Sequence, residues 1–543
     1  MVYNLLMIVS IFNDVIGPVM RGPSSSHCAA ALRIGRLARD LIGDDLRHVK
    51  VEFDNGGSLP TTHTSQGSDM GLFGGLLGFS ADDERLPDSA QKISEAGIEL
   101  DFIYGDYGDQ HPNTYRLTVS GSKAEHSIIA ISTGGGMIEV LSIDNVPITM
   151  FGDYHETLVW IEGNGKIDTQ SIVKELGVDF ANLNQTDSAT ILQIQSQKPI
   201  DESQLQFITG ISQIAHLKPV LPVGSRRGLT VPFQTCAEML ESCQGETSLS
   251  ELAIQYEMDR GGLTEEQVVE QMIEIVSILR KSIQQGLAGT QYADRVLGFQ
   301  SGGFAQAMES GQLVDGGVLN KIVLYTTALM EVKSSMGVIV AAPTAGACAA
   351  LPATCLAAGE SLNLSDEQIA RGLLAAGIIG VFIATHWSFA AEVGGCQAEG
   401  GSAAAMAAAA LVTFQGGTPK QATGAASMAM QNMLGLICDP VANRVEVPCL
   451  GKNVMAASNA VSCANMALAG FDAVIPFDET IAAAKRVAEK MPREHRCTAL
   501  GGLATTPTSL AIEKRLAEGC GSGCGCGSVA VGKPLSSGSN VRK

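Results

Sequence analysis

Two stretches of the sequence, residues 372–391 (GLLAAGIIGVFIATHWSFAA) and residues 400–419 (GGSAAAMAAAALVTFQGGTP), decide how the fold is interpreted. Each runs for 20 residues without a charged side chain, which is about the length that a membrane-spanning helix needs. Both are rich in Gly, Ala and Ser, the first contains His386 and Ser388, and neither is followed by a basic loop of the kind that flanks membrane spans. We therefore predict two buried helices inside a large soluble core.

The composition is that of a folded globular protein. Of the 543 residues, 45% are hydrophobic and 17% are charged, and the length predicts three to four domains. The net charge of −20 argues against binding to nucleic acid or to an anionic membrane. The apolar N-terminus has no preceding Lys or Arg and no small-residue cleavage site, so a secretory signal is not expected. The odd number of cysteines, 13, favours a reducing compartment, which we take to be the cytoplasm.

The pattern along the chain changes twice. Residues 1–150 mix helix and strand signals, with a helix at 27–42 and strands at 48–53, 126–131 and 137–143. Residues 151–222 predict a small α/β sandwich with strands at 157–163, 189–195 and 217–220 and helices at 167–176 and 202–211. Residues 223–518 are helical nearly throughout, with helices at 263–285, 318–333, 366–386, 402–415 and 453–468. The Gly/Cys/Ser-rich residues 519–543 are predicted to form a flexible tail.

Three cysteines lie in sequence that is unsuited to a helix interior: Cys396 in GGCQAEGG, Cys438 in LICDPVAN and Cys449 in EVPCLGKN. Pro440 and Pro448 lie between the last two cysteines, each next to or near one of them, which predicts a non-helical loop that presents both thiols. Thiolates bind iron–sulfur clusters, and three of them leave one iron open as a Lewis acid. The alternative is three unrelated core cysteines, because no compact CxxC array is present. Four further cysteines lie in helical patterns, and we interpret them and Cys497 as structural: Cys236, Cys243, Cys355 and Cys463.

A series of motifs extends this interpretation. GPSSSH, HPN, STGGG, APTAG, GGCQAE, CDPV…VEVPC, ASNA and GGLATTPT follow one another along residues 10–516. In this order they resemble the bacterial iron–sulfur L-serine dehydratases (L-serine ammonia-lyases), in the form that fuses the β and α parts into one chain. The resemblance implies a multidomain α+β fold: an N-terminal α/β substrate domain over residues 1–150, a small ACT-like βαββαβ domain over 151–222 and an all-helical α-type catalytic domain over 223–518. It also implies a [4Fe–4S] cluster held by Cys396, Cys438 and Cys449.

The implied reaction suits these residues. Dehydration of L-serine breaks the β C–O bond and removes the α-proton, for which an open iron serves as Lewis acid and a side chain as base. The candidate catalytic residues are His27 and His111, although His27 alternatively has a structural role in its loop and His111 alternatively caps a turn. The candidate substrate-binding residues are Ser24, Ser25, Ser26, Asn113, Gly134, Gly135, Gly136, Thr344, Lys452 and Asn453. The serines, Lys452 and Asn453 alternatively cap helices, and the glycines alternatively form a plain turn.

The sequence departs from the family pattern at several positions. Residues 65–69 read SQGSD where the family has a GHGTD-like segment, so a histidine is missing, although His63 lies nearby. Cys28 gives SHC in place of SHT, residues 301–304 read SGGF in place of TGGD, and Asn443 and Arg444 replace Gly-Leu. These changes leave open the same chemistry on L-threonine or L-cysteine. They also leave open a non-catalytic iron–sulfur or amino-acid sensor.

Two further expectations concern the tail and the partners. Some relatives close the open iron with a cysteine at the extreme C-terminus, whereas here Cys520, Cys524 and Cys526 lie before the end of the chain. Three alternatives stay open for these cysteines: one of them caps the iron, they bind another metal, or they belong to an unstructured tail. ACT-like domains usually pair edge to edge, so we expect a homodimer that acts on a small amino-acid substrate.

Overall fold

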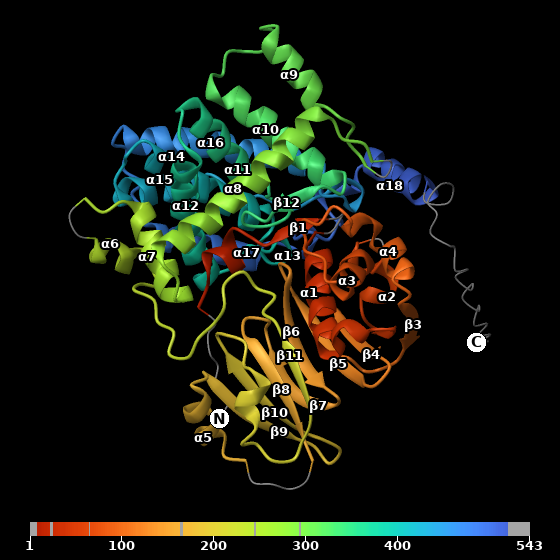
Figure 1. The fold of residues 1–543 in the computed structure, drawn as a ribbon. Coiled ribbons are helices and arrows are strands. Elements are labelled where there is room, and N and C mark those ends of the chain that lie inside the picture. The colour runs from red at the N-terminus through yellow and green to blue at the C-terminus, as the bar shows by residue number, and fades with distance from the viewer. Residues whose placement is uncertain are drawn as a thin grey trace, which may run out of the picture.

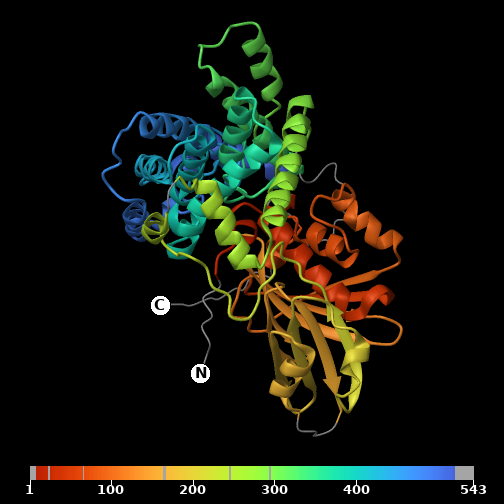
Figure 2. The same ribbon diagram turned by 60° about the vertical axis from the view of Figure 1, so that its left-hand side comes forward.

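The computed structural model describes residues 8–21, 25–64, 66–162, 167–243, 246–292 and 295–519. It is a mixed α+β structure in which two sheets and their helices lie beside a large helical part (Figure 1). Figure 2 shows the same division from a second direction, with the helices of the green-to-blue half on one side and the sheets on the other. Ser24, a predicted substrate-binding residue, and Cys520, Cys524 and Cys526 lie outside the described residues.

The N-terminal sheet has six strands in the order β3-β2-β4-β5-β6-β7. Only β2 and β3 run parallel, and the other neighbours are antiparallel. Helix α1 (Ser25–Ile42) covers one face of this sheet and contacts α3 (Ser68–Leu76) (Figure 1). The strand bounds are β2 (His48–Asp54), β3 (Glu99–Gly105), β4 (Thr114–Ser120), β5 (Glu125–Gly134), β6 (Met137–Ile143) and β7 (Val146–Met150).

The second sheet has four antiparallel strands in the order β11-β8-β10-β9. One face shares a hydrophobic core with the six-stranded sheet, and the other packs against helix α5 (Thr169–Leu176). The bounds are β8 (His155–Ile161), β9 (Phe180–Gln185), β10 (Thr190–Ser196) and β11 (Ile211–Leu217). This position between the first sheet and α5 explains why the two central strands, β8 and β10, are buried on both faces.

Two sequence predictions in this region are wrong. The helix predicted at 202–211 is only the short 3-10 turn η4 (Glu202–Leu205), and the strand predicted at 217–220 lies earlier, at β11. Asp201 forms a capping box with Gln204 that begins the turn, but pairing of residues 211–217 with β8 extends the chain that follows. Strand β9 was not predicted, because its sequence FANLNQ has few strand-forming residues.

The helical part contains all five helices that the sequence predicts there. Helix α12 (Asp366–His386) has the predicted bounds, while α16 (Cys449–Leu468) begins four residues earlier than predicted because Pro448 precedes its first turn. The other long helices are α8 (Glu265–Ala288), α10 (Val318–Ser334), α11 (Ala350–Ser361), α14 (Ser402–Phe414), α15 (Pro419–Gln431) and α17 (Phe477–Lys490). Shorter helices are α6 (Cys236–Ser242), α7 (Leu249–Gly261), α9 (Ser301–Glu309), α13 (Ala391–Gly394) and α18 (Pro507–Gly519).

The two uncharged stretches of the sequence form α12 and α14 at the centre of this part. The alanines of α14 are fully buried, and their small side chains let α12, α15 and α16 approach closely. Among the described helices, α12 alone is long and apolar enough to cross a bilayer, and 78% of its most apolar window is buried inside the molecule. The prediction of two buried helices is therefore confirmed.

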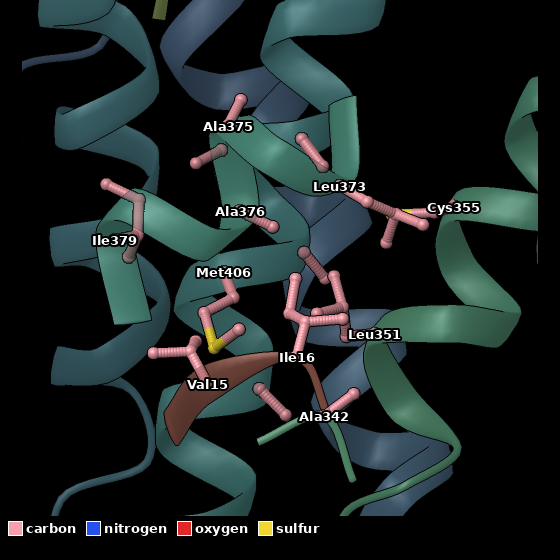
Figure 3. Close-up of a cluster of buried hydrophobic side chains, with 14 of the residues drawn as sticks. Val15, Ile16, Ala342, Leu351, Cys355, Leu373, Ala375, Ala376, Ile379 and Met406 are labelled. Atoms are coloured by element: carbon pink, nitrogen blue, oxygen red, sulfur yellow. The ribbon is translucent and has the colours of Figure 1, made fainter. Parts of the chain in front are cut away.

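The first described residues run through the helical core rather than along the six-stranded sheet. The π-helix η1 (Ile11–Val15) packs against α12, and β1 (Val19–Arg21) pairs with β12 (Val338–Val340). Figure 3 shows Val15 and Ile16 among Leu351, Leu373 and Met406, side chains that come from three different helices. This segment ties the sheet layer to the helical part.

Buried polar contacts hold the same segment in place. The Glu257 carboxylate accepts hydrogen bonds from Ser10 Oγ (2.5 Å) and from the Ile11 amide (2.8 Å). The Asn13 side chain donates to the Val223 carbonyl (2.8 Å) and accepts from the Val223 amide (2.9 Å). Because Asn13 is buried, its loss leaves two backbone groups without partners.

We therefore expect Asn13→Ala to destabilise the protein by about 2–4 kcal/mol, the cost of two buried unsatisfied groups. At roughly 2–4 °C per kcal/mol for a domain of 150–250 residues, the apparent Tm falls by several degrees. Thermal unfolding followed by circular dichroism measures the change. Asn182→Ala, on an exposed position of β9, is the control, and an equal fall in both variants contradicts the anchoring role of Asn13.

Candidate active site

The three cysteines that stand out in the sequence come together in the helical part. Cys396 follows α13 at the start of the π-helix η5 (Gln397–Gly401), Cys438 lies in the loop after α15, and Cys449 is the first residue of α16. Their exposed fractions are only 6%, 3% and 8%. The Cys438 side chain interacts with those of Cys396 and Cys497, and the three residues pack together in one small cluster. Cys449 interacts electrostatically with Cys396. We call these four residues the thiol cluster.

Local sequence explains how Cys396 reaches this position. Gly395 has a φ of 68°, and a Cβ atom there would stand 2.9 Å from the Leu436 carbonyl oxygen, so only glycine fits. The backbone N–H of the next residue, Gln397, donates to the same carbonyl at 2.9 Å, and its side-chain Oε1 accepts a hydrogen bond from the Gly435 backbone N–H at 2.8 Å. These bonds fasten the chain at Cys396 to the loop that carries Cys438.

The environment favours the protonated form of two of these thiols, Cys438 and Cys449. Hydrogen bonding to the Cys396 and Cys497 thiols, followed by burial, raises the pKa of Cys438, and burial raises the pKa of Cys449. All ten cysteines among the described residues are free thiols. Within those same residues, no group of three or more His, Cys, Asp or Glu side chains converges as a single metal ion requires.

Lys452 lies against the thiol cluster, one turn into α16. Its Nζ atom is 3.7 Å from Cys396 Sγ and donates hydrogen bonds to Asp439 Oδ1 (2.6 Å) and to the Ile437 carbonyl (2.6 Å). Burial by itself lowers the pKa of Lys452, but Cys396 and Asp439 more than offset this effect and the pKa is raised. Asp439 also accepts the Leu503 amide at 3.0 Å. Lys452 is thus a partly buried, partnered cation beside the thiols.

Asn453 has a different position from its neighbour. Its side chain accepts the Ala350 amide at 3.0 Å and donates to the carbonyls of Gly346 and Cys449, both at 2.9 Å. It is buried, with an exposed fraction of 4%. These contacts join the start of α16 to the APTAG loop before α11, and they use all of the amide's hydrogen-bonding atoms. In this structure Asn453 therefore connects two segments, and substrate binding by Asn453 stays a prediction.

A second polar group surrounds Glu399 on η5. Thr344, a predicted substrate-binding residue, donates its hydroxyl to Glu399 Oε1 at 2.7 Å. A Cβ atom at Gly346 would stand 2.6 Å from that carboxylate oxygen, so glycine makes room for it. Burial raises the pKa of Glu399 to about 7, the Thr344 hydroxyl lowers it, Glu392 raises it, and Lys333 and Lys452 lower it. Glu399 therefore changes its charge near neutral pH, three residues from Cys396.

The start of α1 reaches this region from the sheet layer. His27 and Ser26 are partly buried and Ser25 is buried. Burial lowers the pKa of His27, and the carboxylate of Glu392, on α13, opposes that shift. His27 is therefore neutral at pH 7, a form in which one ring nitrogen accepts a proton. Residues 25–27, at the start of α1, thus lie near the segment that carries Cys396.

The predicted glycine turn also lies near the start of α1. Gly134, Gly135 and Gly136 join β5 to β6, and all three have a positive φ. A Cβ atom at Gly136 would stand 3.2 Å from the Ala29 side chain, and the Gly136 carbonyl accepts a hydrogen bond from buried Arg33 at 2.6 Å. Gly134 and Gly135 are exposed and have open space around them. Their backbone is accessible, and contact with substrate stays a prediction.

His111 and Asn113 form a turn before β4. The Asn113 amide donates to His111 Nδ1 at 3.2 Å, Thr114 Oγ1 donates to the His111 carbonyl at 2.7 Å, and Ser58 Oγ donates to Asn113 Oδ1. These contacts match the alternative in which His111 caps a turn. A catalytic role for His111 and a substrate contact for Asn113 stay predictions.

A buried histidine, His63, lies beside the segment 65–69 that departs from the family pattern and pairs with its Asp69. His63 Nδ1 lies 2.6 Å from Asp69 Oδ1, and His63 Nε2 lies 2.9 Å from the Tyr104 hydroxyl. Ser65 lies outside the described residues. Asp69 of the altered segment thus binds the neighbouring His63, which has two partners and is largely buried.

Four residues of this region were not assigned a role from the sequence: Glu392, Glu399, Lys333 and Cys497. Glu399 carried a signal, because it belongs to the quoted motif GGCQAEGG. Lys333 lies at the end of α10 and acts electrostatically on both Glu399 and Cys449, but nothing in its local sequence indicates this. Cys497 was interpreted as structural, and the structure places its thiol against Cys438.

Comparisons with known proteins identify relatives of this chain. Residues 244–504 match the family model described as "Serine dehydratase alpha chain". The chain is 40% identical over 288 residues to the probable L-serine dehydratase alpha chain of Bacillus subtilis, covering 53% of this chain and 96% of that protein. It is 41% identical over 146 residues to the probable beta chain of the same organism, covering 27% of this chain and 66% of that protein. It is 26% identical over 515 residues to L-serine dehydratase 2 of Escherichia coli, covering 89% of this chain and 96% of that protein.

One chain thus matches proteins that are described separately as alpha and beta chains. The fold and the buried thiols define a multidomain α+β protein with a cysteine-lined site in its helical part. The chain belongs to the L-serine dehydratase family.

Proposed function

We propose that this protein is an L-serine ammonia-lyase that converts L-serine to pyruvate and ammonia with a [4Fe–4S] cluster bound by Cys396, Cys438 and Cys449. The observation that carries the proposal is the meeting of these thiols, from three separate segments, in one buried place beside Glu399. The relatives named above are L-serine dehydratases, which supports L-serine as the substrate.

The residues fit such a cluster. Cysteine thiolates are its usual ligands, and the three thiols are shielded from solvent. Lys452 Nζ, at 3.7 Å from Cys396 Sγ, and Lys333 near Cys449 offset the negative charge that deprotonated thiols bring. A four-iron cube is larger than a single ion, so its thiolates need not converge on one point. When bound, the cluster supplies an iron that acts as Lewis acid toward the β-hydroxyl of the substrate.

The side chains around the thiols serve binding and proton transfer. Glu399 has a pKa of about 7, which matches the value that suits a general acid or base near neutral pH. We assign it the exchange of a proton with the substrate. His27, neutral at pH 7, and the accessible backbone of Gly134 and Gly135 are placed to hold substrate polar groups. After loss of the α-proton and of the hydroxyl as water, the aminoacrylate tautomerises and hydrolyses to pyruvate and ammonia.

The hydroxyl of Thr344 is expected to tune Glu399. It donates to the carboxylate and so lowers its pKa. In Thr344→Val this hydrogen bond is lost, and the acid limb of kcat/KM moves toward higher pH by up to about one unit, since a hydrogen bond to a charged group contributes about 1.5 kcal/mol or more. A pH profile of pyruvate formation measures the shift. Thr354→Val, on α11, is the control, and an unmoved limb in Thr344→Val contradicts the assignment.

An anaerobic experiment tests the proposed function. The protein is purified without oxygen, its iron and sulfide are counted, and ultraviolet–visible and Mössbauer spectra are recorded with and without L-serine. We expect a brown protein with four irons per chain, a spectral change at one iron with L-serine, and release of pyruvate. Formation of a 2-oxo acid from L-threonine or L-cysteine but not from L-serine would identify the related substrate instead. A brown protein that releases no 2-oxo acid from any of the three favours the sensor.

The domain organisation and the assembly are part of the same proposal. Numbered from β8, the second sheet has the order 4-1-3-2, which supports an ACT-like domain over residues 151–222, between a substrate domain over 1–150 and a catalytic domain over 223–518. We propose that these domains pair in a homodimer, in the cytoplasm, where the free thiols stay reduced. Light scattering after gel filtration, with an expected mass of twice 56.6 kDa, tests the dimer.

A further inference from the structure

We infer that Cys497 is a fourth thiol ligand of the site, which binds the cluster iron that Cys396, Cys438 and Cys449 leave open when no substrate is present. This inference rests on the proposed function, because it presumes the cluster. It goes beyond the set of three cysteines that the motifs indicate, and it assigns a role to a residue whose own sequence surroundings, EHRCTALGG, carry no ligand motif.

The first observation is the contact between side chains. The Cys497 side chain interacts with that of Cys438, which itself interacts with Cys396. Cys497 also packs on the small hydrophobic cluster that contains Cys396 and Cys438. Cys497 is therefore a neighbour of two proposed ligands, Cys396 and Cys438.

The second observation is how the backbone holds Cys497 there. The Cys438 amide donates to the His495 carbonyl at 2.9 Å, and Cys438 forms an isolated parallel bridge with Arg496. Arg496 in turn donates to the Met491 carbonyl at 2.7 Å. Cys497 itself has a φ of 59°, a left-handed conformation that is costly for a residue other than glycine and that the surrounding contacts enforce.

The third observation concerns the loop on the other side of Cys497. Asp439, which binds Lys452, also accepts the Leu503 amide at 3.0 Å. The segment 495–503 is thus fastened to the Cys438 loop at both ends, with Cys497 between the two attachments. A thiol held in this way remains beside the site without depending on the tail after residue 519.

The chemistry balances without an oxidant. The Cys497 thiol releases its proton to solvent as its sulfur shares an electron pair with the iron. When the hydroxyl of the substrate takes that position, the sulfur–iron bond breaks and the sulfur regains a proton. No electron is transferred, and the iron is shielded from loss whenever substrate is absent.

The test uses the anaerobically purified, cluster-loaded protein and Cys497→Ser. Limited oxidation with ferricyanide removes an iron that lacks a protein ligand and leaves a three-iron cluster, which electron paramagnetic resonance detects. We expect this signal to appear at least about tenfold faster in Cys497→Ser than in the natural protein, the lower end of the 10–100-fold cost of losing a residue that supports a metal site. Cys243→Ser, at a partly buried cysteine of α6's C-terminal end, is the matched control.

Two further measurements keep the outcome clear. In the loaded natural protein, iodoacetamide labelling of Cys497, read by mass spectrometry, is expected to be slow and to speed up with L-serine, and this readout does not depend on a variant that folds. A triple variant, Cys520→Ser/Cys524→Ser/Cys526→Ser, tests the tail. The inference is overturned if Cys497→Ser oxidises like the control, if only the triple variant oxidises faster, or if labelling of Cys497 ignores L-serine.

These outcomes are distinct from failure of the proposed function. If the natural protein binds no cluster and forms no pyruvate, the proposed function fails. If it does both while Cys497→Ser behaves like Cys243→Ser, the proposed function stands and only the assignment of Cys497 fails.

Discussion

Replacement of Cys449 by serine is expected to abolish L-serine dehydration and to bleach the anaerobically purified protein. Cys449 begins α16 and carries a buried thiol that interacts electrostatically with Cys396. A Lewis-acid metal contributes several kcal/mol to the stabilisation of the transition state, and each 1.36 kcal/mol is tenfold in rate. Loss of the cluster therefore lowers kcat by roughly 10³-fold or more, which an assay of pyruvate formation measures together with the iron content.

The same helix provides the matched control. Cys463 lies further along α16, is fully buried and contacts Asn432 and Asn459 rather than the thiol cluster. We expect Cys463→Ser to keep its iron and to retain activity within a few-fold. If both variants lose activity with their iron content intact, or if Cys449→Ser retains both, the assignment of Cys449 is wrong.

Replacement of Glu399 by glutamine is the second large effect that we expect. The amide keeps the shape and the hydrogen bond from Thr344 but carries no titratable proton. Because general acid–base groups contribute about 10²–10⁴-fold, kcat falls by roughly that factor. The iron content and the visible spectrum stay unchanged, which separates loss of proton transfer from loss of the cluster.

The pH dependence gives a more specific test of Glu399. With a pKa of about 7, a base is protonated and inactive below that value, so kcat/KM rises with pH and levels off above about 7. Glu399→Gln loses this limb. A residual activity with the same limb in Glu399→Gln shows that another group titrates.

Stability provides a readout that does not involve activity. Burial raises the pKa of Glu399 from 4.5 to about 7, so between these values the folded protein binds more protons than the unfolded chain. Stability is then present below the unfolded pKa and is lost as pH rises toward 7. The difference in apparent Tm, Glu399→Gln minus natural protein, is therefore expected to be more positive at pH 8 than at pH 5.

Much of the helical part was predictable because its signals are local. The bounds of α12 follow from Ser365 and Gln368, which form a capping box at its start, and from an apolar run that a helix buries on all sides. The strands β2 and β6 show the alternation expected of half-buried strands. The helix predicted at 202–211 is wrong beyond Leu205, because residues 211–217 pair with β8, which is far away in sequence.

In the candidate site too, the residues with a local sequence signal were predictable and the others were not. Cys396, Cys438 and Cys449 stand out because prolines and glycines surround them, and Glu399 belongs to one of their motifs. Lys333, Glu392 and Cys497 carry no such signal, because their roles depend on which helices and loops become neighbours. The path of residues 8–16 through the helical core could not be predicted from the sequence either, because Glu257, which binds Ser10, is 247 residues away along the chain.

The sequence by itself determined the family, the two uncharged core helices and the three cysteines set apart from ordinary helix interiors, because each depends on residue types within a short window. Only the tertiary structure decided that a glutamate of raised pKa, two lysines and a fourth thiol gather around those cysteines. Burial and long-range contacts create these properties, and neither is a property of the local chain.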